Sequence, residues 1–134
     1  MRILLDVNVF QDALTSRPGS LASLEVLQRV EDGIDEGLIS ALTVPILWYL
    51  NHKARDARRI VYEIVARCEI APLTKELLDR AYENTNIPDI EDAVQYETAK
   101  AGNCAAIITR NIADSPLNDI AVHAPEQYLA STRQ

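Results

Sequence analysis

The sequence is poor in the residues that build zinc sites and disulfide-bonded folds, with two cysteines and two histidines among 134 residues. Structural zinc needs more ligands at closer spacing, so we expect Cys68 and Cys104 to be buried thiols. His52 and His123 belong to no recognisable Ser-His-Asp or Cys-His pattern, and the glycines form no phosphate-binding loop. Covalent nucleophilic catalysis and nucleotide binding through a glycine-rich loop are therefore not indicated.

A long hydrophobic run is also lacking. A membrane-spanning helix needs roughly 20 apolar residues, and no stretch approaches that length. The apolar start at residues 3–5 meets Asp6 before the core of a signal peptide can develop. We therefore expect a cytoplasmic protein with no membrane association.

Positive charge is scarce, with 13 lysines and arginines against 20 aspartates and glutamates and a net charge of -7. A protein that binds nucleic acid in bulk normally carries a broad basic face, so this class is disfavoured. The balance is still compatible with an enzyme that meets nucleic acid through a metal ion and a small basic patch. Acidic residues gathered at a metal site would themselves lower the net charge.

What is present is an alternation of short apolar runs with helical patterns. Helices are predicted at residues 21–34, with Gly33 and Gly37 bracketing the end, from an N-cap at Thr43, at 60–68, at 77–82, and after Pro88 to 101, where Gly102 can supply the C-terminal cap. Strands are predicted at 3–5, 38–40, 69–71, 105–109 and 120–122. This order predicts an α/β fold, a three-layer α/β/α sandwich with a short central parallel sheet, spanning residues 1–134 as one domain. In such sheets ligands bind beyond the carboxyl ends of the strands.

Acidic and amide residues gather where this topology places ligands. Asp6 and Asn8 follow the first strand, and Asn111 and Asp114 follow the strongest one. A third group, at residues 89–92, heads the helix that precedes that strand. Hard oxygen ligands suit Mg²⁺ or Mn²⁺, which can polarise a phosphate and activate water. The pattern therefore predicts a divalent metal site at the carboxyl edge of the sheet.

Each group also has a simpler interpretation. Asp6 and Asn8 are suited to turning the chain and capping a helix that starts near Val9. Asp89 is a good N-cap, which would leave residues 91 and 92 in a first turn, where the helix dipole favours negative charge. Asn111 and Asp114 are compatible with an ordinary loop. The metal site rests on all three groups occurring at the right points of one topology.

The sequence resembles the PIN domain family, close to the small VapC-like ribonuclease toxins of bacterial toxin–antitoxin pairs. The segments that carry the resemblance are residues 4–9, 39–43, 89–96 and 107–114. The resemblance implies a Mg²⁺- or Mn²⁺-dependent endoribonuclease, a hydrolase of phosphodiester bonds in RNA. It also implies a small antitoxin partner and a homodimer.

Carried over by position, the resemblance assigns catalytic roles to Asp6, Asp92, Asn111 and Asp114, with Asp6 and Asp92 as metal ligands. Asp89 and Glu91 are secondary acidic candidates, able to ligate directly or through water. The departure is at Ile46, where PIN domains usually place a second acid. Isoleucine can neither bind metal nor activate water.

A basic run and an aromatic pair remain to be placed. The basic run is either a solvated helix face or a patch that contacts RNA phosphates, and it comprises Lys53, Arg55, Arg58 and Arg59. Trp48 and Tyr49 are interpreted as core or dimer contacts rather than platforms for stacking bases.

Two rival functions stay open beside the endoribonuclease toxin. The first is a degenerate PIN domain that keeps the fold and binds RNA or protein without catalysis. The second is a phosphatase-like or DNA-directed metal hydrolase on a related fold.

Overall fold

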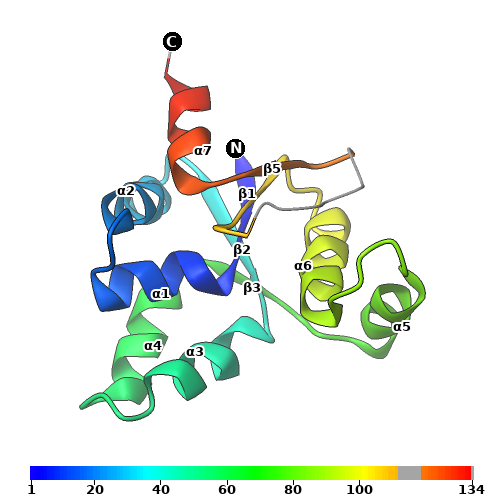
Figure 1. Cartoon of the computed structure of the whole chain (residues 1–134), viewed down its shortest axis with the longest axis horizontal. Helices are drawn as coiled ribbons and strands as arrows, with labels where there is room; N and C mark the ends of the chain where they lie inside the picture. Colours follow the sequence, from blue (N-terminus) through cyan, green and yellow to red (C-terminus); the bar gives the residue numbers. More distant parts are fainter. Residues whose placement is uncertain (112–118, 134) are drawn as a thin grey trace.

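A computed structural model describes residues 1–111 and 119–133, and its centre is a parallel sheet. The strands are β1 (Arg2–Leu5), β2 (Glu36–Ser40), β3 (Glu69–Ala71), β4 (Ala106–Ile108) and β5 (Ala121–His123), in the spatial order β3-β2-β1-β4-β5 (Figure 1). All neighbouring pairs are parallel, so the carboxyl ends of β1, β2 and β4 share one edge. The predicted α/β class and the parallel sheet are confirmed.

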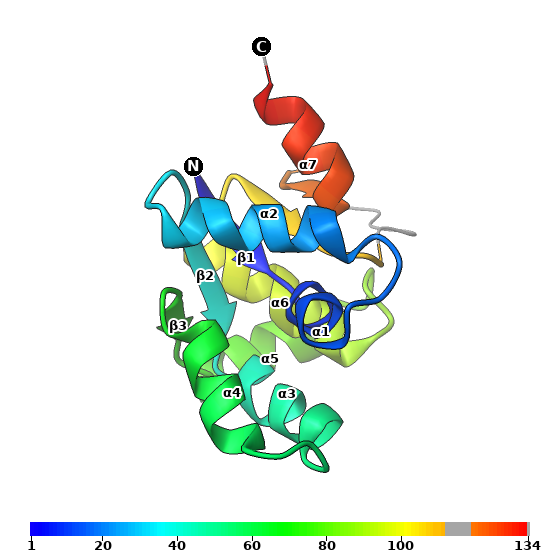
Figure 2. The same cartoon turned by 90° about the vertical axis from the view of Figure 1, so that its left-hand side faces the viewer.

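Helices cover both faces of this sheet. They are α1 (Val7–Thr15), α2 (Ser20–Glu31), α3 (Thr43–Asn51), α4 (Ala57–Val65), α5 (Lys75–Glu83), α6 (Ile90–Ala101) and α7 (Pro125–Thr132). The strands run between α1–α4 on one side and α5–α6 on the other (Figure 1). In Figure 2, α2 runs across the view above α1, which is seen nearly end-on. Within the described ranges, no helix has both the length and the apolar character needed to cross a membrane.

The alternation of side chains along β1 builds two cores. Ile3 and Leu5 face the larger one, where they pack with Phe10 of α1, and all three are fully buried. Leu4 points the other way and packs against Tyr96 of α6. Burial on both faces explains why the strands read as unbroken apolar runs, as is usual for parallel sheets.

Several predicted boundaries were wrong. The helix predicted at residues 21–34 ends at Glu31, because Gly33 adopts a left-handed conformation (φ 75°), and Ile34 lies outside it with 56% of its surface exposed. Thr43 is not an N-cap. It is the first residue of α3 and fully buried, and its hydroxyl accepts a hydrogen bond from Gln95. Cys68 lies beyond the end of α4 and is only half-buried, whereas Cys104 is buried as expected.

Gly102, predicted to cap the C-terminus of α6, does stand at that position. Its φ of -85° is ordinary, so glycine is not required for backbone freedom. A Cβ atom there would clash with the Cδ2 atom of Leu38 on β2. The absence of a side chain therefore lets the end of α6 approach the sheet closely, which anchors the helix whose other end carries Asp89, Glu91 and Asp92.

Candidate metal site

Asp6 lies at the carboxyl edge of the sheet, between the end of β1 and the start of α1. Its backbone N–H donates to the carbonyl of Ile108 on β4 (3.1 Å). Its side chain caps α1 by accepting from the backbone N–H of Val7 at Oδ1 (2.7 Å). The second oxygen, Oδ2, accepts from the Thr109 hydroxyl (2.7 Å) and from the Asn8 amide (3.2 Å). Three residues therefore orient this one carboxylate.

The end of β4 is tied to α1 by a second set of bonds. The backbone N–H of Arg110 donates to Oδ1 of Asn8 (3.0 Å), whose Nδ2 lies 3.3 Å from the Thr109 hydroxyl oxygen. The Thr109 oxygen also accepts from the backbone N–H of Asn111 (3.0 Å). Asp6, Asn8 and Thr109 consequently form one hydrogen-bonded unit that joins two neighbouring strands at the edge where ligands are expected.

The other acidic residues stand at the head of α6. Asp89 is the N-cap and accepts from the backbone N–H of Asp92 (3.1 Å). Glu91 and Asp92 lie in the first turn and are partly buried. Asp89 therefore caps the helix, as one interpretation of the sequence predicted. The carboxylates of Glu91 and Asp92 do not cap it.

The pKa values show that Asp6 and the head of α6 share one electrostatic environment. Burial, which disfavours a charged carboxylate, raises the pKa of Asp6, and Asp89 adds to this effect. Burial likewise raises the pKa of Glu91, followed by the nearby charges of Asp6, Asp89 and Asp92. The pKa of Asp92 is raised by burial and then by Asp89 and Asp6. Negative charge is therefore concentrated here at a cost that a cation would relieve.

The donor chemistry fits a hard cation, although the ligand set is sparse. Within residues 1–111 and 119–133, none of these four carboxylates forms a salt bridge. Over the same residues, no group of three or more Asp, Glu, His or Cys side chains is close enough together to hold a metal ion. Asp114, the remaining acidic candidate, lies outside the described residues. The described residues thus place several carboxylates within electrostatic reach of one another without forming a complete coordination shell.

Asn111 and Ile46 differ in how they relate to this edge. Asn111 is exposed and contributes a backbone hydrogen bond to Thr109. Ile46 lies on α3, is half-buried and packs against the larger core. The position that the resemblance assigns to the usual second acid is therefore occupied by an apolar side chain that contributes to packing.

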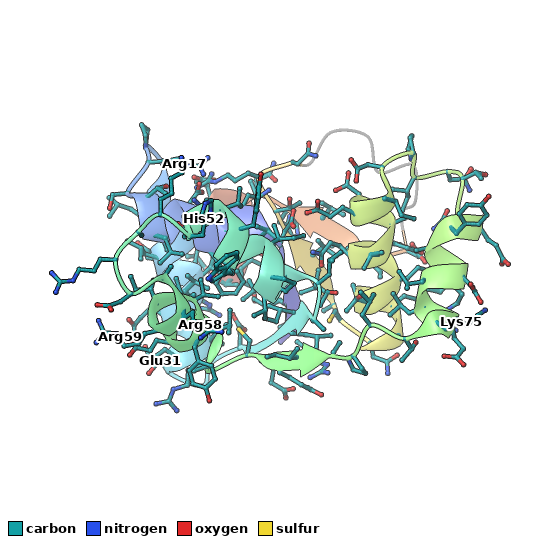
Figure 3. All side chains as sticks on the ribbon, turned by 90° about the horizontal axis from the view of Figure 1, so that it is seen from below. Arg17, Glu31, His52, Arg58, Arg59 and Lys75 are labelled. Atoms are coloured by element: carbon teal, nitrogen blue, oxygen red, sulfur yellow. The ribbon has the colours of Figure 1, made fainter. Side chains whose placement is uncertain are left out.

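The basic run lies away from the sheet, in the α3–α4 connection and the first turn of α4. All four side chains are exposed, and Arg59 pairs with Asp56 (3.4 Å) and Glu63 (4.0 Å). Arg58 and Arg59 lie at the opposite end of the molecule from Lys75 (Figure 3). Helix α3 connects the carboxyl end of β2 to the basic run. Its nine residues, at about 1.5 Å each, separate the basic run from that end of β2 by about 13 Å.

Sequence reasoning missed the roles of Thr109 and Arg110. Thr109 binds Asp6 directly, and the Arg110 side chain bonds to Asp12, Glu126 and the carbonyl of Gly19. Their position directly after the strongest predicted strand was a usable signal. Only carboxylate and amide side chains were selected from the sequence as candidates for this site, so the hydroxyl of Thr109 and the guanidinium of Arg110 were not included.

A sequence profile of the PIN domain matches residues 2–113, most of the chain. The chain belongs to the PIN domain family. The matched range includes the whole Asp6–Asn8–Thr109 unit and the head of α6, and stops before β5 and α7. The resemblance stated from the sequence is confirmed, and the family makes a nuclease-type enzyme the general class of activity.

Solved structures of toxin–antitoxin proteins share this PIN fold. A toxin–antitoxin complex from Klebsiella pneumoniae has a TM-score of 0.72 at 20% identity, covering 92% of this chain and 97% of that one. VapBC2 from Rickettsia felis, bound to a promoter DNA fragment, has a TM-score of 0.68 at 18% identity, covering 91% and 97%. VapC20 from Mycobacterium tuberculosis, a toxin that cleaves the sarcin–ricin loop, has a TM-score of 0.63 at 11% identity, covering 89% and 98%. No curated protein matches the sequence.

Proposed function

We propose that this PIN domain is a metal-dependent endoribonuclease and the toxin of a type II toxin–antitoxin pair. The observation that carries the proposal is the set of acidic side chains, from Asp6 and the head of α6, gathered at the carboxyl edge of the sheet without a basic partner among the described residues. The family and the toxins with the same fold support it.

In this proposal Asp6 and Asp92 hold Mg²⁺ or Mn²⁺, and Asp89 and Glu91 add direct or water-mediated contacts. Asn111 and Asp114 shape the site. The bound ion would polarise a phosphate of RNA and lower the pKa of a water molecule. Thr109 and Asn8 keep the Asp6 carboxylate in one orientation through their hydrogen bonds to Oδ2.

The test is a manganese titration joined to an RNA cleavage assay, with Asp92→Asn as the variant. Wild type should bind Mn²⁺ and cleave RNA, and Asp92→Asn should weaken both by at least about 10-fold, because a hard cation depends on anionic oxygens. Asp79→Asn, an exposed acid on the neighbouring helix α5, is the matched control and should behave as wild type. A wild type that neither binds Mn²⁺ nor cleaves RNA would refute the proposal.

Metal-free stability shows whether Asp92→Asn remains folded. The folded-state pKa of Asp92 is raised, so its ionised form opposes folding above that pKa. The variant should therefore be slightly more stable than wild type at neutral pH without metal. This advantage should disappear as the pH falls through the raised pKa towards the ordinary value of about 4, where both states bind the proton.

A degenerate PIN domain is the second candidate, and Ile46 favours it. This residue places a methyl-bearing side chain where the family usually has an acid, and it packs against the larger core. In the same assay, RNA binding that persists with no cleavage at saturating Mn²⁺ would identify a non-catalytic module.

We further propose that the basic run contacts RNA phosphates. Arg58→Glu/Arg59→Glu should weaken RNA binding by at least about 10-fold, to a similar degree for unrelated sequences, because phosphate contacts position RNA without reading bases. Wild-type binding should fall steeply with salt, and the variant should show a shallower dependence. Fluorescence anisotropy at several salt concentrations measures both. Unchanged affinity in the variant would make this run a solvated helix face.

The partners we propose are an antitoxin and a second copy of the chain. Trp48, Tyr49 and Leu50 of α3 are each more than 40% exposed, so they are not core residues of a monomer. A groove of about 500 Å³ between α3 and α4 is lined by Trp48, Val61 and Tyr62. Exposed apolar surface of this kind usually marks an interface.

Sedimentation at tens of micromolar should show a dimer. Trp48→Asp should weaken the dimer or the capture of a co-expressed antitoxin, because it places a charge in the contact. A monomeric wild type would refute the homodimer. Normal capture by a folded Trp48→Asp variant would place the antitoxin surface elsewhere.

A further inference from the structure

We propose that Arg110 is a positioning residue of the metal site: by clamping α1 and α7 to the end of β4, it sets the geometry of the Asp6–Asn8–Thr109 unit. The inference rests on the proposed metal-binding function. Arg110 does not reach the Asp6 carboxylate itself, and its effect passes through Asn8 and Thr109.

The guanidinium of Arg110 gathers three separate elements. Its Nε donates to Oδ2 of Asp12 on α1 (2.7 Å), and one terminal nitrogen donates to both carboxylate oxygens of Glu126 on α7. The other terminal nitrogen donates to the carbonyl of Gly19, just before α2. Every nitrogen of the guanidinium is therefore engaged, and its planar fork fixes the relative positions of these elements.

The contact with Asp12 is the one that couples to the site. Asn8 and Asp12 are four residues apart on α1, so they lie on the same face of the helix. Asn8 accepts from the backbone N–H of Arg110, and Asp12 accepts from its side chain. One residue at the end of β4 thus holds this helix face at two points, directly after the N-cap Asp6. A rotation or shift of α1 would have to break both contacts.

Burial makes the clamp hard to replace. The side chain of Asp12 is only 7% exposed, and its Oδ2 receives a further hydrogen bond from Ser23 (3.0 Å). Loss of the guanidinium would leave a buried carboxylate without its cation, which favours movement of α1 towards solvent. Through Glu126, the C-terminal helix α7 joins the same arrangement, although it lies beyond the part of the chain that the PIN profile matches.

A matched control separates positioning from stability. Arg29 has nearly the same exposure as Arg110 (26% against 27%) and forms an equivalent bond, from Nε to the buried Asp35 (2.8 Å). Asp35 precedes β2, at the amino edge of the sheet. Arg110→Gln and Arg29→Gln therefore each remove a bond from Nε to a buried aspartate, at opposite ends of the strands; Asp35 keeps its ion pair with the N-terminal amine (3.2 Å).

The readouts are the Mn²⁺ dissociation constant and the thermal midpoint, measured for each variant. Arg110→Gln should weaken Mn²⁺ binding about 10-fold, as is typical when support for a ligand is lost, and Arg29→Gln should leave it unchanged despite its own loss of stability. Arg110→Lys keeps the charge without the fork, so it should recover thermal stability more fully than affinity. Equal Mn²⁺ affinity in Arg110→Gln and Arg29→Gln would overturn the inference.

Two further measurements keep the test decisive. If Arg110→Gln does not fold, Arg110→Lys replaces it, because it keeps a cation beside Asp12 but loses the planar fork; unchanged Mn²⁺ affinity there overturns the inference. If wild type binds no Mn²⁺, the proposed function fails. The NMR signals of the Asn8 side-chain amide then test whether Arg110 holds Asn8 in place. A shift of these signals in Arg110→Gln or Arg110→Lys but not in Arg29→Gln supports the clamp, and identical signals in all variants overturn it.

Discussion

Asp6→Asn is expected to weaken Mn²⁺ binding by about 100-fold or more and to reduce RNA cleavage in proportion, because it would remove the most firmly oriented anionic ligand of the proposed metal site, which has few others. Asparagine is a good N-cap, so α1 should still begin at Val7. Isothermal titration with Mn²⁺ and a cleavage assay at saturating metal measure the two effects.

The pH dependence of binding provides an internal check on this prediction. Because burial raises the pKa of Asp6, protons should compete with the metal at pH values above the ordinary range of a carboxylate. Wild-type affinity should therefore increase as the pH rises through that raised pKa, and the dependence should be weaker in Asp6→Asn. Equal Mn²⁺ affinities in wild type and Asp6→Asn would mean that Asp6 is not a metal ligand.

Asp35→Ala is expected to lower the free energy of unfolding by about 3–5 kcal/mol, as is typical when one partner of a buried ion pair is removed. The Asp35 side chain is 2% exposed and accepts from Nε of Arg29 (2.8 Å) and from the Tyr128 hydroxyl (2.8 Å). The substitution leaves the hydroxyl and the guanidinium without an acceptor near the ends of α2 and α7. Urea denaturation at neutral pH measures the loss.

Acid should reduce the difference between Asp35→Ala and wild type. Burial alone would raise the pKa of Asp35, but the hydrogen bonds from Arg29, Tyr128 and the N-terminal amine, together with the charge of Arg29, outweigh it, and the pKa lies below its ordinary value. A lowered folded-state pKa gives stability that is complete above about pH 4 and is lost as the pH falls through the folded-state value. Wild type and Asp35→Ala should therefore converge in strong acid. A loss below about 1 kcal/mol at neutral pH would mean that this buried pair contributes no more than a surface one.

The sequence by itself determined the features that depend on local pattern. Short apolar runs between amphipathic stretches identified the five strands and the parallel α/β class, because side chains alternate in strands and recur every three to four residues in helices. The caps at Asp89 and Gly102 were also legible, since the groups that end a helix are close in sequence. Gly33 was also a correct local signal, since it is left-handed directly after the C-cap Asp32, whereas the apolar spacing carried the predicted helix too far, to Ile34.

Tertiary structure alone decided which residues surround the acidic ones and what each is bonded to. The hydroxyl that orients Asp6 comes from Thr109, 103 positions along the chain, and the cation that satisfies Asp12 comes from Arg110, 98 positions away. It also decided that Trp48 is exposed while Leu47 beside it is fully buried. Such contacts depend on how α1 and α3 pack beside β4 and β2. No local pattern encodes that packing, because it results from burying both faces of the sheet at once.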